Sequence, residues 1–288
     1  MLPGVVAVAA GMSLGLIRWR LNPRHGATVL ASVVLGTVAV ALAVVVTIAG
    51  GFLISVPVVT AVLEACSLGP SGHVVGWTAG VPAMIATAWI LLRIRTVVAT
   101  HRWAASGSSG RGFVLLDSEE PIAYAAPGDP GSIVVSSGMF DVLGPDERSV
   151  LLAHEAAHLE LGHHRHLMIA DLGLAVLPPL RPLVDQLRLA VERAADEAAV
   201  QEVDGDRNLV AAAIARAAVA KSTYRPATAG FLGATAPLRV EALIGSPPRR
   251  ALLVLGAIVA GLGIAGNAGA LAVQGHHLAT AIRHVCGA

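Results

Sequence analysis

The sequence predicts an α-helical membrane protein with about four transmembrane helices and an inserted cytosolic α+β domain. The first observation behind this prediction is the composition. Of the 288 residues, 55% are hydrophobic and 14% are charged, and the mean hydropathy is +0.71. The second observation is the position of the charges, because residues 1–17, 26–92 and 251–282 contain a single charged side chain, Glu64. Such long uncharged runs are typical of membrane-spanning segments.

A transmembrane helix needs about 20 consecutive apolar residues. The runs that meet this length are residues 27–50, 74–98 and 251–273, and a shorter candidate covers residues 2–17. The short run could instead be a signal peptide, but Arg18 and Arg20 stand where a cleavage site would be expected, so an uncleaved span is favoured. The second run continues past Pro57 and is too long for one straight span. Its far end should bend or lie in the membrane interface.

The basic residues predict the orientation. They lie between the first two spans (Arg18, Arg20, Arg24), after the third (Arg93, Arg95, Arg102) and before the fourth (Arg249, Arg250). The positive-inside rule places these connections in the cytosol. We therefore expect a multi-pass plasma-membrane protein with an N-terminal membrane region (1–99), a cytosolic domain (100–248), and a last span with a short external tail (249–288). Both termini would lie outside.

The composition excludes several functions. Twenty Lys and Arg against 19 Asp and Glu leave no basic surface for a nucleic acid, so no direct nucleic-acid contact is expected. A metal transporter needs ionisable groups inside its spans, which are almost free of them. Two cysteines are too few for a cysteine-based zinc site. Any metal must therefore be bound by His, Asp or Glu.

The two cysteines, Cys66 and Cys286, would share the outer, oxidising side in this topology. A disulfide between them could form there. The alternative is two unrelated small residues near the membrane, because the sequence does not give the Cα separation that a disulfide requires.

The central block begins with a Gly/Ser linker at residues 106–110. Three short apolar segments follow, each bounded by Gly, Pro or Asp, and they predict a small sheet. They cover residues 113–116, 122–126 and 132–135. Pro145 then opens a strong helix with Asp146 and Glu147 in its first turn.

That helix contains the motif His154-Glu155-Ala-Ala-His158. Residues four apart lie on one face of a helix, so the two imidazoles are placed to bind one Zn²⁺ while Glu155 is turned aside toward a water molecule. A third ligand is available in Glu192, 34 residues after His158, and Asp196 lies one turn further on. In this arrangement Glu192 would bind the metal and Asp196 would accept an N–H from a ligating imidazole.

His164 is a rival third ligand, because it occupies the last position of the pattern HExxHxxGxxH. The glycine that this pattern requires is replaced by Leu161, which argues against it. The simpler interpretation is a polar turn that ends the helix and contains His163, His164 and His166.

Residues 167–184 are nearly apolar enough to span the membrane. A single crossing would place Glu192 on the opposite side from His158, so they could not share an ion. We therefore expect a bent segment that lies on, or dips into, the cytosolic leaflet beside the site. Burial inside the soluble domain is the alternative.

Residues 112–200 resemble the gluzincin membrane metallopeptidases, most closely the BlaR/MecR-type integral-membrane proteases of bacterial sensor systems. The resemblance rests on the segment from Pro127 to Gly138 (PGDPGSIVVSSG), the acidic helix start, the HExxH motif, the ExxxD motif and the Pro-Leu-Arg181-Pro-Leu-Val run. HtpX-like and CAAX-processing proteases share HExxH and ExxxD and are the close alternative. The resemblance implies a zinc endopeptidase domain with one Zn²⁺ per chain, bound by His154, His158 and Glu192, and with Glu155 as catalyst.

BlaR-type receptors carry a large external penicillin-binding domain after the last span, whereas the sequence ends about 15 residues beyond Val273. We therefore expect no direct β-lactam sensing, and a separate sensor protein for any signal. The implied function is regulated proteolysis of a cytosolic or membrane-associated protein, such as a transcriptional repressor. HtpX-like quality control is one alternative. A non-catalytic sensor or scaffold is another, although the intact chemical residues argue against it.

Two further features of the site are expected. By likeness to the family, an extended substrate would pair with an exposed strand edge formed by Ile122, Ala123, Tyr124, Ala125 and Ala126. Enzymes of this type usually add a donor for the tetrahedral oxyanion. Arg239 or Tyr224 could supply it, with an ordinary surface role as the alternative for each.

Overall fold

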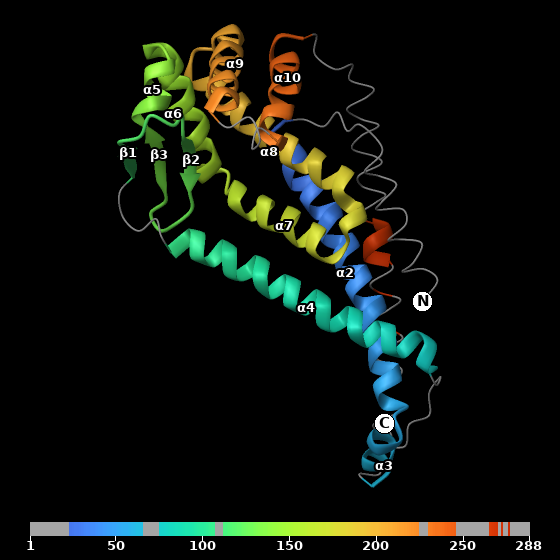
Figure 1. Cartoon of the computed structure of the whole chain (residues 1–288). Coiled ribbons are helices and arrows are strands. Elements are labelled where there is room, and N and C mark those ends of the chain that lie inside the picture. The colour runs from blue at the N-terminus through green and yellow to red at the C-terminus, as the bar shows by residue number, and fades with distance from the viewer. Residues whose placement is uncertain are drawn as a thin grey trace.

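A computed structural model of the chain describes residues 23–65, 75–106, 112–224, 230–245, 265–269, 272 and 276. Several features expected from the sequence lie outside these residues. They are the span at 2–17, Cys66 and Cys286, most of the linker at 106–110, and most of the span at 251–273. Figure 1 shows the arrangement of the described helices and strands.

Two helices in the described part of the chain are long and apolar enough to cross a membrane. They are α2 (Pro23–Ile54) and α4 (Trp77–Ser106). Helix α2 extends beyond the predicted run 27–50 at both ends, whereas α4 begins inside the run 74–98 and continues past its C-terminal end. The chain bends after α2, and α3 (Pro57–Ala65) begins at a proline, which suits the first turn of a helix. In the most apolar 18-residue stretch of each helix, the buried share is 44% in α2 and only 11% in α4. Helix α4 therefore leaves most of its apolar surface uncovered by the protein.

The three predicted strands are present as β1 (Phe113–Leu116), β2 (Ala123–Ala126) and β3 (Ser132–Ser136). They form one sheet of order β1-β3-β2, in which β3 pairs parallel with β1 and antiparallel with β2. Strand β2 therefore lies at an edge. Helix α5 (Ser137–Val142) follows β3 directly, and the Ser136 side chain accepts the backbone N–H of Met139 as its N-cap.

Gly138, in the first turn of α5, allows the chain to fold tightly at this point. A Cβ atom at this position would lie 2.0 Å from the carbonyl oxygen of Glu119, which no side chain tolerates. The Gly138 N–H donates to the Ser118 carbonyl at 2.9 Å. Glycine is therefore required where the segment before β2 crosses the end of β3.

Helix α6 (Pro145–Glu160) begins at a proline, and its Glu147 side chain accepts the Gly144 N–H at 2.8 Å. Further helical segments follow it between residues 163 and 244. They are α7 (His163–Val176), the 3₁₀ turn η1 (Pro178–Leu180), α8 (Arg181–Glu202), α9 (Arg207–Tyr224) and α10 (Gly230–Ile244). Gly162, between α6 and α7, has φ of +62°, a left-handed conformation that ends α6 and lets a new helix start at once.

The segment at 167–184 is bent, and the bend lies at η1. It forms the end of α7, the turn and the first residues of α8, and both helices pack against α2. Figure 1 shows α7 running from near the sheet toward α2. Helix α4 packs against both α7 and α2. On α8, Leu183, Val184, Leu187 and Val191 are fully buried in this core, and burial of each stabilises the packing by about 2 kcal/mol.

Polar contacts of Asp171 and of Asn267 join other parts of the chain to this core. The Asp171 carboxylate of α7 lies 2.9 Å from His101 Nε2 on α4 and accepts a hydrogen bond from Arg188 Nη2 on α8 at 2.7 Å. In the short helical stretch 265–269, Asn267 Nδ2 donates to Thr37 Oγ1 on α2 at 3.3 Å, and both residues are buried. The C-terminal stretch thus lies against α2.

Candidate metal centre

The motif on α6 brings two imidazoles together. His154 and His158 are one turn apart, their Nε2 atoms are separated by 3.1 Å, and their ring centroids by 4.8 Å. Both side chains are largely buried, at 12% and 13% exposed. Residues at positions i and i+4 of a helix point the same way, so this pair follows from the helix itself.

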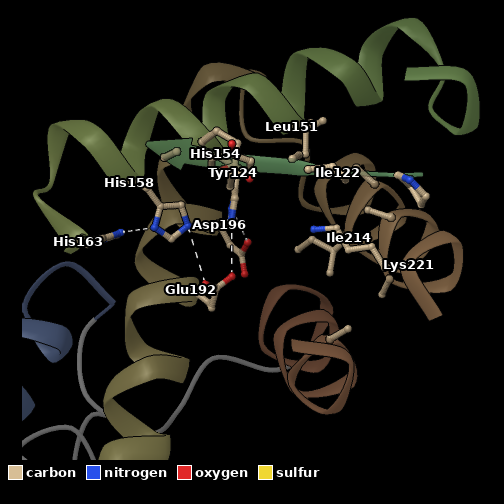
Figure 2. A pocket seen from close by; sticks show the side chains of 18 of the residues that line it. Ile122, Tyr124, Leu151, His154, His158, His163, Glu192, Asp196, Ile214 and Lys221 are labelled. Atoms are coloured by element: carbon tan, nitrogen blue, oxygen red, sulfur yellow. Dashed lines mark hydrogen bonds and ion pairs between the residues drawn. The ribbon is translucent and has the colours of Figure 1, made fainter. Parts of the chain in front are cut away.

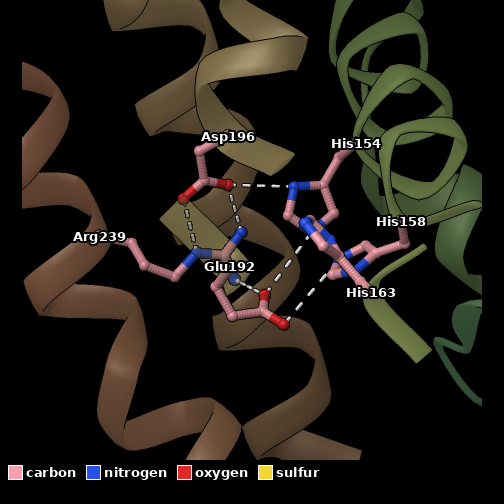
Figure 3. Close-up of polar contacts among 6 residues, drawn as sticks. All are labelled: His154, His158, His163, Glu192, Asp196 and Arg239. Carbon is pink, nitrogen blue, oxygen red and sulfur yellow. Dashed lines mark hydrogen bonds and ion pairs between the residues drawn. The ribbon is translucent and has the colours of Figure 1, made fainter. Parts of the chain in front are cut away.

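Helix α8 packs against α6 and supplies the third group. Glu192 Oε2 lies 3.6 Å from His154 Nε2, and Oε1 lies 3.9 Å from His158 Nε2. One donor atom from each of the three residues falls within 4.8 Å of the other two. Figure 3 shows the carboxylate facing both rings. Two imidazole nitrogens and one carboxylate oxygen form a donor set that zinc takes in catalytic sites, with a fourth position left open.

Asp196, one turn after Glu192, contacts the outer side of His154. Its Oδ1 lies 3.0 Å from His154 Nδ1, and its side chain is 2% exposed. The contact leaves Nε2 as the nitrogen that points to Glu192. The carboxylate therefore orients the ring in the way that metal-ligating histidines need.

Arg239 on α10 binds both carboxylates (Figure 3). Its Nη1 lies 2.9 Å from Glu192 Oε2, and its Nε donates to Asp196 Oδ2 at 2.8 Å. The guanidinium is 11% exposed. The surface role weighed for Arg239 is thus wrong, because α10 folds back over α8 and buries the side chain. Its Nη2 also donates to Asp196 Oδ1, so Nε and Nη2 together make the forked contact with one carboxylate that is typical of arginine.

The pKa values of His154 and His158 are shifted in opposite directions. Burial disfavours the protonated form of both. At His154 the hydrogen bonds to Asp196 and Glu192 outweigh burial and raise the pKa to about 9. At His158 burial and the charge of His154 lower the pKa to about 3. Burial opposes ionisation of Glu192, but the contacts with His154 and Arg239 hold its pKa well below the usual value. The cluster thus keeps Glu192 ionised.

Glu155 lies beside this cluster and is 7% exposed. Burial raises the pKa of its carboxyl group, and the positive charges of His154 and Lys221 oppose that rise. A buried carboxylate with a raised pKa is a stronger base than an exposed one, and it is suited to take a proton from water.

A cavity of about 610 Å³ contains these groups. Residues from β2, α6, α8, α9 and α10 line it, and His101 and Ala104 of α4 also reach it. Figure 2 shows Ile122 and Tyr124 along one side, with His158 at one end and Lys221 at the other. Of the segment predicted to bind substrate, Ile122 to Ala126, the last four residues form β2 at an edge of the described sheet, and all but Ala126 line the cavity.

Two other residues weighed from the sequence, Tyr224 and His164, also lie at the cavity. Tyr224 lines the cavity but is 49% exposed, and its hydroxyl is 3.5 Å from Glu119 Oε2. His164 also lines the cavity, but among the described residues the group of three metal donors contains only His154, His158 and Glu192.

The contact of His163 with His158 was not predicted from the sequence. The prediction of a polar turn at His163, His164 and His166 is wrong, because Gly162 ends α6 and all three residues lie in the first turn of α7. His163 is 2% exposed, and its Nδ1 lies 2.9 Å from His158 Nδ1. Burial lowers the pKa of His163 to about 4. The isolated glycine before a run of histidines was the signal that could have indicated a second helix start.

Comparison with known proteins adds one match. Residues 93–223 match the model of peptidase family M48, an interval that includes the sheet and the helices α6 to α9. The match supports a metallopeptidase of this family and does not assign the BlaR/MecR subtype. No curated protein and no solved structure matches the chain.

Proposed function

We propose that this protein is a membrane-anchored zinc endopeptidase that cleaves a cytosolic or membrane-associated protein. The main support for this proposal is the convergence of the donor atoms at the site. Donor atoms of His154, His158 and Glu192 converge within 4.8 Å, and Glu155 lies beside them in a cavity bordered by a free strand edge. The match to peptidase family M48 supports the same activity.

The residues fit zinc, since their donor set is the one that catalytic zinc sites use. When bound, zinc would act as a Lewis acid that polarises the scissile carbonyl and makes a water molecule more acidic. Glu155 accepts the proton of the attacking water on its carboxylate and returns it to the departing amine nitrogen. Its side chain is 7% exposed, which limits competition from bulk solvent.

The remaining polar groups hold this arrangement. Asp196 fixes the ring of His154, and Arg239 clamps Asp196 and Glu192 together. Because the Arg239 guanidinium contacts both acids, we assign it to positioning them. Tyr224 lines the same cavity, but its hydroxyl would have to leave Glu119 to act as an oxyanion donor.

Strand β2 would bind the substrate. It lies at the edge of the sheet, and Tyr124 on it is 48% exposed. An extended peptide can add to such an edge through backbone hydrogen bonds, which give affinity without demanding one sequence. The scissile bond would then lie over the zinc ligands on the facing side of the cavity.

Membrane anchoring is supported by α2 and α4, both long and apolar enough to cross a bilayer. On α4, Trp77, Ile85 and Leu92 are each more than 60% exposed, as lipid-facing residues would be. With the basic residues inside, the site faces the cytosol. We propose regulated proteolysis of a repressor or membrane protein as the role, with a separate sensor for the signal.

Glu155→Gln tests the proposal, because it removes the base and keeps the shape of the side chain. Glu160→Gln is the matched control, an exposed glutamate on the next turn of α6. New protein N-termini would be mapped by mass spectrometry in cells that express each form, and the zinc content of each purified protein would be measured. We expect both variants to retain zinc and only Glu155→Gln to lose the cleavage products. Unchanged products in Glu155→Gln would favour a non-catalytic scaffold.

A further inference from the structure

The outer side of His158 contacts a residue that the proposed mechanism does not use. His163 Nδ1 lies 2.9 Å from His158 Nδ1, and the two rings meet edge to face with centroids 4.8 Å apart. His163 is 2% exposed. We propose that His163 is a positioning residue, whose neutral imidazole accepts the Nδ1–H of His158 and holds the opposite nitrogen toward the metal. The proposal rests on the zinc site proposed above.

The contact has a direction. Two nitrogens at hydrogen-bond distance share one proton, so one Nδ1 donates and the other accepts. His158 Nε2 faces His154 Nε2 at 3.1 Å and Glu192 Oε1 at 3.9 Å, so this nitrogen must be unprotonated to bind a metal. The proton of neutral His158 therefore sits on Nδ1. His163 accepts it and carries its own proton on Nε2.

The two ligating imidazoles thus have different partners. The outer nitrogen of His154 contacts a carboxylate, Asp196, whereas the outer nitrogen of His158 contacts a neutral ring. A carboxylate partner orients a ligand and adds negative charge, whereas a neutral imidazole orients it without adding charge. His163 therefore fixes the geometry of the second ligand in a cluster that already contains two ionised acids.

The local backbone places His163 for this contact. Gly162 adopts φ of +62°, which few other residues tolerate, and this torsion separates the end of α6 from the start of α7. His163 becomes the first residue of α7, five positions after His158, and its side chain turns back toward α6. His164 follows immediately, and no hydrogen bond joins it to a ligand imidazole among the described residues. It provides a matched control.

The test compares four full-length proteins: wild type, His163→Leu, His163→Asn and His164→Leu. Zinc affinity would be measured by competition with a chelator, and ligand geometry by the visible spectrum of the Co²⁺-substituted protein. We expect His163→Leu to lose about 10–100-fold in zinc affinity and to change the Co²⁺ bands. His163→Asn should remain close to wild type, because its amide oxygen can take the place of Nδ1 as acceptor. His164→Leu should match wild type in both measurements.

Equal zinc affinity and identical Co²⁺ spectra for wild type and His163→Leu would overturn the inference. A loss in His163→Asn as large as that in His163→Leu would also overturn it, since packing and not the hydrogen bond would then be responsible. If His163→Leu does not fold, His163→Ala takes its place with the same expected loss. A wild-type protein that binds no zinc would instead contradict the proposed function, which separates the two failures.

Discussion

The two halves of α8 bury different chemistry. The N-terminal half places Leu183, Leu187 and Val191 in an apolar core against α2 and α7, with no exposed area. The C-terminal half buries two carboxylates, Glu192 and Asp196, against α6 and α10. One rigid helix joins them. The apolar half stabilises the fold and sets the position of the helix, and the polar half uses that position to hold charges that would otherwise be unfavourable in the interior.

The position of the candidate metal centre depends on packing against α2. Helix α2 is one of the two segments apolar enough to cross a bilayer, and it packs along the N-terminal half of α8. The position of Glu192 relative to the α6 imidazoles is therefore set in part by packing against α2. Substitutions in each half should separate stability from chemistry.

Removing Arg239 should have the largest effect on stability. In Arg239→Met the side chain keeps much of its length, but Glu192 and Asp196 lose their shared cation while remaining buried. We expect the free energy of unfolding to fall by about 3–5 kcal/mol, as when one partner of a buried ion pair is deleted. Denaturant unfolding in detergent micelles measures it.

Arg239→Lys is the control for charge, and it should recover part of the loss because it restores the cation without the forked contacts. An Arg239→Met protein as stable as the wild type would show that the two acids do not need a cation. The contrast between the halves of α8 would then fail.

Truncating the apolar half should have a comparable or smaller effect. Leu187→Ala removes a fully buried side chain and leaves a cavity between α8 and α2, which costs about 2–5 kcal/mol. Gln201→Ala, at an exposed position of the same helix, should change the free energy of unfolding by less than about 0.5 kcal/mol.

Cleavage by Leu187→Ala would also be measured under conditions where this variant remains folded. We expect kcat per folded molecule close to wild type, because the chemical groups are untouched. A loss of kcat without a loss of stability would mean that the apolar half acts directly on the site.

Asp171→Asn should have the smallest effect. Its carboxylate is 38% exposed and contacts His101 of α4 and Arg188 of α8, so solvent screens the ion pairs. We expect a loss of about 0–1 kcal/mol in the free energy of unfolding. Asp185→Asn on α8 is the control, because no ion pair to Asp185 is found within the described residues. A loss above about 3 kcal/mol would make this contact a structural anchor comparable to Arg239.

Local patterns predicted much of the fold. The structure contains the predicted strands at 113–116 and 132–135 and the predicted helix from Pro145. These elements could be predicted because the alternation of a strand, the period of a helix and a proline at a helix start are all visible within a few residues of sequence. The apolar runs at 27–50 and 74–98 were recognised, although α2 begins before its run and α4 continues past its run to Ser106. Helix ends depend on capping and on neighbouring elements, so hydropathy predicts them less well.

From the sequence alone, residue spacing is enough to predict which site residues share one face of a helix. The spacing of His154 and His158, and of Glu192 and Asp196, puts each pair on one helical face regardless of the remainder of the chain. The way in which the faces of different helices pack against one another can be seen only in the folded chain. Arg239 reaches Asp196 across 43 residues of sequence, and His163 turns back to His158 through a left-handed glycine. Such contacts arise from packing and from one backbone torsion, and neither has a periodic signature in the sequence.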